Sequence, residues 1–129
     1  VLVGAGKLGR ALLGYSGFAE YGLNIVAAFD ASDALIGTTN SGKPILHLSR
    51  LHDVCVKHQI RIGIITVPAE HAQKVCDLLI ENGIRAIWNF APKHLDVPDD
   101  ILVQNENMAA SLALLSKHLS DRMKNHESE

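Results

Sequence analysis

Short apolar runs alternate with amphipathic segments along the whole chain. Because the runs are apolar at successive positions, as buried parallel strands are, they predict strands at residues 1–3, 24–30, 45–48, 61–67, 84–90 and 101–103. Apolar residues at helical spacing predict helices over residues 7–15, 50–58, 69–81 and 107–124. Loops are predicted at residues 31–44 and 91–100, which are polar or rich in turn-forming residues. This alternation predicts an α/β fold with a doubly wound parallel sheet.

A glycine-rich sequence joins the first strand to the first helix. It has the pattern G-x-G-x-x-G and consists of Gly4, Ala5, Gly6, Lys7, Leu8 and Gly9. In a Rossmann-type fold the first glycine permits a tight turn, the second lets the backbone approach a pyrophosphate, and the third lets helix and strand pack closely. We therefore assign these six residues to a dinucleotide site, although such a pattern also occurs in ordinary loops.

An acidic residue, Asp30, ends the second strand. It follows Gly9 at close to the spacing of about 20 residues at which Rossmann folds place the acid that binds the adenosine ribose. A carboxylate there accepts hydrogen bonds from ribose hydroxyls and repels a 2′-phosphate, and the neighbouring Ala31 supplies no cation. The sequence thus favours NAD(H) over NADP(H). The alternative is that Asp30 only closes the turn after its strand.

Two further strand ends offer candidate ligand contacts. Thr66, Val67 and Pro68 end a central strand, where open α/β sheets bind ligands, and we assign them to the middle or the nicotinamide end of the cofactor. Asn89 ends the next strand and is assigned to the same crevice. The alternative for residues 66–68 is a strand end that only caps the following helix.

The last predicted helix has a wider apolar face than one sheet edge requires. Met108, Leu112, Leu115 and Leu119 form one stripe, and further apolar residues broaden it. Two interpretations follow: the helix packs back on its own sheet, or it packs against a second subunit.

The composition is that of one ordinary globular domain, with 129 residues, 47% of them hydrophobic and 20% charged. No apolar run is long enough to span a membrane, and the net charge of −2 gives no basic footprint for nucleic acid.

Cys55 and Cys76 fall in helix-like patterns without a CxxC motif, which indicates buried, reduced thiols and a cytoplasmic setting. Because Val1 falls inside a strand, we expect the chain to be part of a longer protein.

The sequence shows no recognisable catalytic residues. A dehydrogenase needs a substrate domain and a placed acid or base, yet only the last helix and a tail follow the nucleotide fold. Tyr15 and Tyr21 both lack the lysine four residues on that a Tyr-x-x-x-Lys dyad requires. None of the seven histidines pairs at metal-ligand spacing, and only His71, beside the expected crevice, merits attention. We predict no catalytic residues, no metal site and a role in sensing rather than turnover.

Four ordered blocks of sequence together resemble the redox-sensing transcriptional repressors of the Rex family. They span residues 4–13, 25–30, 64–69 and 83–92, and residues 105–108 and 112–116 fit as well. The resemblance implies a bacterial homodimer that compares NADH with NAD+. In that family an N-terminal winged-helix domain binds operator DNA, a Rossmann domain binds the dinucleotide, and a C-terminal helix is exchanged between subunits. NADH closes the dimer and releases the DNA.

Carried onto this chain, the resemblance predicts its domain organisation. Residues 1–104 would be the NAD(H)-binding Rossmann domain, 105–125 the exchanged dimerisation helix and 126–129 a tail. The winged-helix domain would precede Val1 and be absent from this chain.

The resemblance also implies roles for single residues. The glycine turn would hold the pyrophosphate, Asp30 the adenosine ribose, and residues 66–69 with Asn89 would lie near the nicotinamide. Met108 matches a position where the family often places a hydrophobic or aromatic residue against the partner's nicotinamide. Asn107 stands where an Asp is common, which argues against a charge-based switch in the last helix.

Two other functions fit parts of the sequence. One is the nucleotide-binding domain of an NAD-dependent reductase whose substrate domain has been cut away. The other is a coenzyme A-binding domain, which shares the general α/β layout. The Asp30 carboxylate argues against coenzyme A, because the 3′-phosphorylated ribose would meet a like charge.

Overall fold

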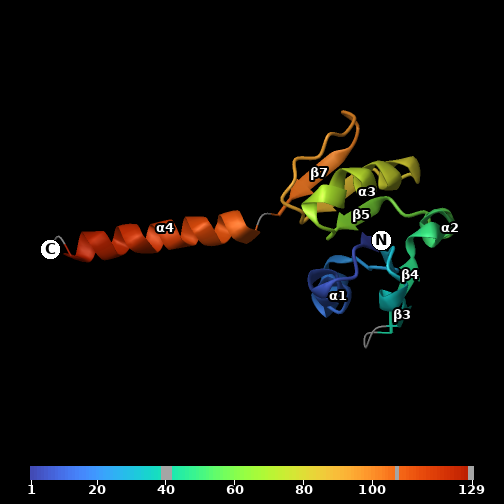
Figure 1. The fold of residues 1–129 in the computed structure, drawn as a ribbon, viewed down its shortest axis with the longest axis horizontal. Coiled ribbons are helices and arrows are strands. Elements are labelled where there is room, and N and C mark those ends of the chain that lie inside the picture. Colours follow the sequence, from blue (N-terminus) through green and yellow to red (C-terminus); the bar gives the residue numbers. More distant parts are fainter. Residues whose placement is uncertain (39–41, 107, 128–129) are drawn as a thin grey trace.

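A computed structural model of the chain describes residues 1–38, 42–106 and 108–127 (Figure 1). Short 3₁₀ helices are labelled η. In chain order the elements are β1 (Leu2–Val3), α1 (Lys7–Leu13), η1 (Ser16–Tyr21), β2 (Ala28–Asp30), η2 (Asp33–Leu35), β3 (Gly37–Thr38), β4 (Pro44–His47), η3 (Leu48–Arg50), α2 (Leu51–His58), β5 (Ile62–Ile65), α3 (Ala69–Glu81), β6 (Ala86–Asn89), β7 (Leu102–Asn105) and α4 (Met108–Glu127).

The strands of the described ranges form one sheet in the order β3-β4-β2-β1-β5-β6-β7. All neighbours are parallel except β3, which runs antiparallel to β4 at one edge. From β1 the chain builds outward through β2 and β4, and then continues on the other side of β1 with β5. The strand order therefore reverses between β1 and β5, as it does in doubly wound dinucleotide-binding sheets. The predicted Rossmann-type fold is confirmed, whereas exchange of the last helix is not shown in a single chain.

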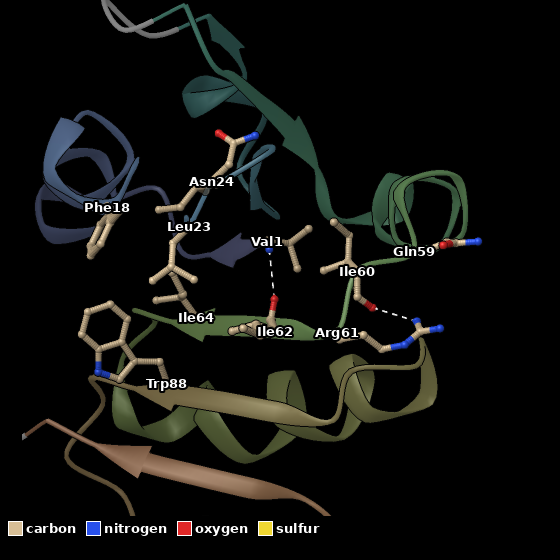
Figure 2. Close-up of a pocket in the computed structure, with 11 residues that line it drawn as sticks. Val1, Phe18, Leu23, Asn24, Gln59, Ile60, Arg61, Ile62, Ile64 and Trp88 are labelled. Atoms are coloured by element: carbon tan, nitrogen blue, oxygen red, sulfur yellow. Dashed lines mark hydrogen bonds between the residues drawn. The ribbon is translucent and has the colours of Figure 1, made fainter. Parts of the chain in front are cut away.

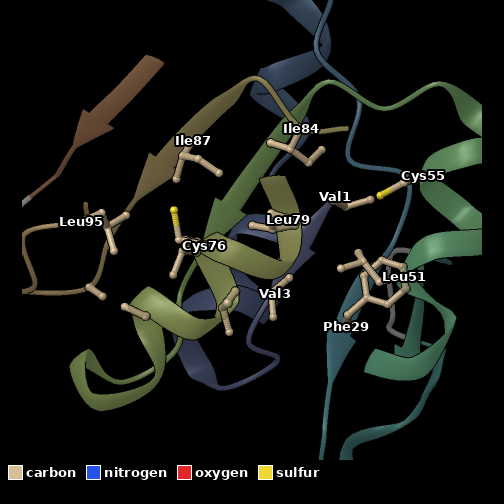
Figure 3. Packing of buried hydrophobic residues seen from close by; sticks show 14 of the residues in the cluster. Val1, Val3, Phe29, Leu51, Cys55, Cys76, Leu79, Ile84, Ile87 and Leu95 are labelled. Atoms are coloured by element: carbon tan, nitrogen blue, oxygen red, sulfur yellow. The ribbon is translucent and has the colours of Figure 1, made fainter. Parts of the chain in front are cut away.

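Helices cover the two faces of the sheet unequally. On one face, α2 and α3 bury their apolar sides against β1, β2, β5 and β6, and this layer holds the larger core, around Val3, Phe29, Ile65 and Leu79 (Figure 3). On the other face, α1 and η1 cover a smaller cluster around Leu2 and the neighbouring strands. Burial of each large apolar side chain contributes about 1.5–3 kcal/mol, so the α3 side supplies most of the core's stabilisation.

The sequence of α3 explains its position. The buried positions Ala72, Val75, Cys76 and Leu79 recur at intervals of three and four and face the sheet. The helix ends at Asn82, where the next residue, Gly83, has a φ of +92°. Glycine adopts this left-handed conformation without strain, so the predicted C-cap is confirmed.

Several predicted boundaries differ from the structure. The second strand was expected over residues 24–30, but β2 begins only at Ala28 because its neighbour β1 begins at Leu2, directly opposite. The predicted loop 31–44 contains the short edge strand β3, too brief for a periodic signal. The last helix reaches Glu127 and so includes residues that were assigned to the tail.

Helix α4 extends away from the rest of the molecule (Figure 1). All side chains from residue 113 to residue 124 are exposed, including Leu114, Leu115, Leu119 and Met123, whose exposed fractions are 55–65%. The interpretation in which this helix packs back on its own sheet therefore does not match the structure. No helix in the described part of the chain is long and apolar enough to cross a membrane.

Candidate functional site

The glycine turn lies at the carboxyl end of β1, at the point where the strand order reverses. Gly4 has a φ of +112°, which favours glycine. A Cβ on Gly9 would collide with the Gly4 carbonyl oxygen, so the turn and α1 approach each other too closely for any side chain. The roles predicted for the first and third glycines agree with this geometry. Gly6 has no heavy atom within 4 Å of where its Cβ would be, and its approach to a pyrophosphate stays a prediction.

A hydroxyl from the residue that follows β5 fixes the turn from the side. Thr66 Oγ1 lies 2.7 Å from the Gly4 carbonyl oxygen and 3.1 Å from that of Val3, and donates to these carbonyls. Thr66 was predicted as a cofactor contact. In the structure its hydroxyl is engaged with the turn, so its contribution is to hold the turn in place.

Asp30 joins the end of β2 to the same turn. Its Oδ2 accepts a hydrogen bond from the backbone N–H of Ala5 at 2.9 Å, and its Oδ1 accepts one from Ser32 at 2.8 Å. The second bond is the local turn contact that was considered as the alternative role of Asp30. The first links residues 25 positions apart and was not predicted. Asp30 lines the cleft while it makes both hydrogen bonds.

A cleft of about 850 Å³ opens beside these strand ends. One wall is formed by the ends of β1 and β2, and the other by one side of α3 along its length and by the segment before it. Gly4, Asp30, Ala31, Val67 and Pro68 are the predicted residues that line it. Its volume is in the range of small-molecule and cofactor sites.

Several lining residues were not assigned from the sequence. Ser32 follows β2 and Leu48 begins η3, and α3 contributes a row of side chains with helical spacing: His71, Lys74, Val75, Asp77, Leu78 and Glu81. The amphipathic pattern of α3 identified its buried stripe, whereas its neighbouring stripe faces the cleft. His71, singled out as a candidate, is on this face.

Asn89 differs from its predicted role as a ligand contact. Its side chain is fully buried, with an exposed fraction of 0%. The amide accepts a hydrogen bond from Ala91 N–H and donates toward the Ala91 and Lys93 carbonyls and toward Asn105. The side chain is therefore occupied in holding backbone, and does not reach the cleft.

Met108 is the first residue of α4, and its side chain is outside the described part of the structure. Asn107 lies outside the described residues altogether. Ala5 and Gly9 are buried in the turn, while Gly6 and Lys7 are exposed and Leu8 is half-buried.

The two thiols are buried as predicted. Burial raises the pKa of the Cys55 thiol, and it raises the pKa of Cys76 to about 11, with the neighbouring Asp77 carboxylate adding to the effect. Both side chains therefore stay protonated near neutral pH. In the described ranges no three His, Cys, Asp or Glu side chains gather in a way that would hold a metal ion.

A second, smaller cavity of about 310 Å³ lies at the opposite, amino-terminal edge of the strands. Figure 2 shows Phe18, Leu23, Ile62, Ile64 and Trp88 around it. The glycine turn and Asp30 do not line it. Gly4 and Asp30, which were predicted to bind a dinucleotide, therefore lie at the 850 Å³ cleft and not at this smaller cavity.

A model of one protein family, described as CoA binding domain, matches residues 1–93. These residues include the glycine turn, Asp30 and all of α3. The chain belongs to the CoA-binding domain family. Within this family, the resemblance to Rex repressors is confirmed by curated relatives and solved structures.

The redox-sensing transcriptional repressor Rex of Bacteroides fragilis is 44% identical over 119 residues, which cover 92% of this chain and 54% of the relative. The Rex repressor of Clostridium kluyveri is 42% identical over 121 residues, covering 94% of this chain and 58% of the relative. This member of the family thus spans a little more than half the length of these relatives.

Solved structures of a Rex-family repressor called RSP share the fold. The structure with NADH has a TM-score of 0.89 and 33% identity, and the match covers 99% of this chain and 62% of that one. The structure with NAD+ and operator DNA has a TM-score of 0.86 and 34% identity, over 99% and 60% of the two chains. The ligands named for the RSP structures, NADH and NAD+, are the ones that the sequence predicted for this chain. Coenzyme A, named in the family description, is not.

Proposed function

We propose that this chain is the NADH/NAD+-sensing domain of a redox-sensing transcriptional repressor. The observation that carries the proposal is the pairing of Asp30 with the glycine turn at the mouth of the cleft. A dinucleotide bound across the switch point would place its pyrophosphate on the turn and its adenosine ribose at Asp30. RSP, whose fold is the same, has been solved with both redox states of this cofactor.

The charge at Asp30 separates NAD(H) from ligands with a phosphorylated ribose. NADP(H) carries a 2′-phosphate and coenzyme A a 3′-phosphate, and either would lie against a carboxylate that already accepts two backbone hydrogen bonds. The family's description names coenzyme A, which keeps this ligand as the competing candidate. Calorimetric titration with NADH, NADPH and coenzyme A decides between them. We expect NADH to bind most tightly, and a preference for coenzyme A would refute the proposal.

The protein is proposed to act as a homodimer through α4. Leu115 and Leu119 of α4 are exposed, and the part of the sheet face opposite α3 that α1 and η1 do not cover also carries exposed apolar side chains. In-register pairing puts Ile62, Ala86 and Leu102 side by side on that face, with Ile62 48% and Leu102 73% exposed. If two copies exchange their α4 helices, the apolar stripe of each helix covers the exposed apolar residues on the sheet of the other copy, and both surfaces become buried.

Redox discrimination is proposed to come from desolvation. Oxidised nicotinamide is cationic and the reduced ring is neutral, so an apolar enclosure completed by the partner's helix penalises NAD+. Each tenfold preference for NADH over NAD+ needs about 1.4 kcal/mol of difference in binding free energy. The desolvation of the one positive charge on oxidised nicotinamide is sufficient to supply a difference of this size. Met108 is the proposed apolar contact. Met108→Asp is expected to weaken NADH binding more than NAD+ binding, whereas equal losses would refute this account.

Operator DNA would be bound by a winged-helix domain, and NADH would release it by closing the dimer. We expect such a repressor to act in the cytoplasm, where the operator and the NADH pool meet. The competing function is the nucleotide domain of a reductase. Steady-state oxidation of NADH by the full-length protein distinguishes the two, since robust turnover of any substrate would contradict a sensor without catalytic residues.

A further inference from the structure

One buried amide at the carboxyl end of β6 joins two separate segments of the chain. Asn89 Oδ1 accepts a hydrogen bond from the Ala91 N–H at 3.0 Å. Its Nδ2 lies 3.2 Å from the Ala91 carbonyl, 3.0 Å from the Lys93 carbonyl and 3.1 Å from Asn105 Oδ1. The amide has two N–H groups for these three acceptors, so its donors are fully used.

The first of these segments, residues 91–93, lies on the second half of the fold. In a doubly wound sheet the adenosine half of a dinucleotide lies over the strands on one side of the switch point, and the other half over the strands beyond it. Here those strands are β5 and β6. Asn89 therefore holds the loop that follows the strand end nearest to the nicotinamide in the proposed function.

The second segment leads directly into α4. Asn105 ends β7, and the next residue, Glu106, donates its backbone N–H to the Asn89 carbonyl at 2.9 Å. The Glu106 carboxylate also accepts a longer hydrogen bond, of 3.4 Å, from Nε1 of Trp88. The segment that precedes α4 is thus attached to β6 by the side chains of two adjacent β6 residues.

We propose that Asn105 is a positioning residue, which fixes the segment that precedes α4 relative to the second half of the dinucleotide site through its hydrogen bond to Asn89. The inference rests on the proposed function and adds the element that connects the ligand to the helix. A hydrogen bond that is partly shielded from water holds one geometry more firmly than an exposed one. Loss of this bond leaves the ligand-side loop attached to Asn89 but removes one of the contacts that hold the segment before the helix.

The test compares two ligands of the chain, NADH and ADP, by titration calorimetry. ADP occupies only the adenosine half and the glycine turn, so it reports on the part of the site that Asn105 does not touch. In Asn105→Ala, the ratio of NADH affinity to ADP affinity is expected to fall about 2- to 10-fold, the effect of one neutral hydrogen bond. Asn89 keeps both of its carbonyl acceptors in this variant, and the substitution is at an exposed position, so the fold is retained.

Two further variants separate positioning from general stability. Asn105→Asp keeps an acceptor oxygen for Asn89 and is expected to retain the wild-type ratio. Asn82→Ala is the matched control, because it removes an asparagine that bonds to His52 and to the Leu78 carbonyl at the far end of α3. Its ratio is expected to stay unchanged.

An unchanged ratio in Asn105→Ala would overturn the inference, and so would equal losses of NADH and ADP affinity, which indicate a structural effect only. A wild-type chain that binds both ligands but does not distinguish them would overturn it as well. Failure of the wild-type chain to bind NADH at all would instead refute the proposed function, and the inference with it.

Discussion

Substituting Asp30 by Asn tests whether one carboxylate builds the turn as well as receiving a ligand. The carboxylate accepts two backbone hydrogen bonds, at 2.9 Å from Ala5 and 2.8 Å from Ser32. An asparagine has only one acceptor oxygen, and its NH₂ group would face the N–H that lost its partner. A hydrogen bond to a charged group contributes about 1.5–3 kcal/mol, and one such bond is lost.

We therefore expect Asp30→Asn to lower the free energy of unfolding by about 1.5–3 kcal/mol and the melting temperature by at least several degrees. NADH affinity is expected to fall tenfold or more, because the Ala5 N–H no longer fixes the turn. NADPH is not expected to bind tightly either, because the repelling charge is gone but the turn that would hold its pyrophosphate is no longer fixed by Asp30. Thermal unfolding followed by circular dichroism and calorimetric titration with both cofactors measure these effects.

Asp33→Asn is the control, since it removes a neighbouring exposed acid and leaves the bond to Ala5 intact. It is expected to retain the stability and NADH affinity of the wild type. An Asp30→Asn variant that melts like the wild type but no longer binds NADH would show that the carboxylate serves only the ligand. A variant that gains NADPH binding would show that charge alone sets the preference, and either result refutes the reasoning.

Four other variants probe the turn, the core and the last helix. Gly9→Ala is expected to lose both stability and NADH binding, because its Cβ would collide with the carbonyl of Gly4. Gly6→Ala has open space at its Cβ, so it is expected to melt like the wild type and to lose only NADH binding. Melting curves and calorimetric titration compare the two variants. Stability is expected to fall between pH 9 and about pH 11, since in that window the thiol of Cys76 ionises in the unfolded chain but its raised pKa keeps it protonated in the folded one. Urea unfolding should show a smaller decline in Cys76→Ala. Replacing Leu115 and Leu119 together by Glu is expected to abolish self-association in sedimentation while the helical circular dichroism of the rest of the chain persists, and a variant that still dimerises would contradict the role of α4.

The sequence predicted the half of the site that depends on local pattern. The glycine turn, the acid at the end of β2 and the order of strands all follow from periodicity and from spacing over about 20 residues. These features place Gly4 and Asp30 at one edge of the sheet, and the cleft is lined by both.

The remaining contacts join residues that are distant in sequence, and no local pattern encodes them. The bond from Ala5 to Asp30 requires the turn to rotate one particular N–H toward β2. Asn89 was recognised as a strand-end residue, but its burial depends on the loop after β6 folding back over it. The face of α3 that lines the cleft carries both polar and apolar residues, so its composition resembles that of a solvent-exposed face. Each of these depends on packing between elements rather than on propensity.

The mutual contact of Gly4, Gly9 and Thr66 constrains how this turn can change. A Cβ on Gly4 would lie 2.7 Å from Thr66 Oγ1, and a Cβ on Gly9 would lie 3.0 Å from the same atom and would collide with the Gly4 carbonyl. The three residues therefore share one volume. A Cβ on Gly4 would also lie 2.8 Å from the Thr66 carbonyl carbon and 2.9 Å from the Val67 nitrogen, so a smaller side chain at residue 66 does not make room for it. Random substitution at Gly4 or Gly9 should therefore return almost only glycine, whereas Thr66 should accept smaller residues at the cost of the hydroxyl that holds the turn.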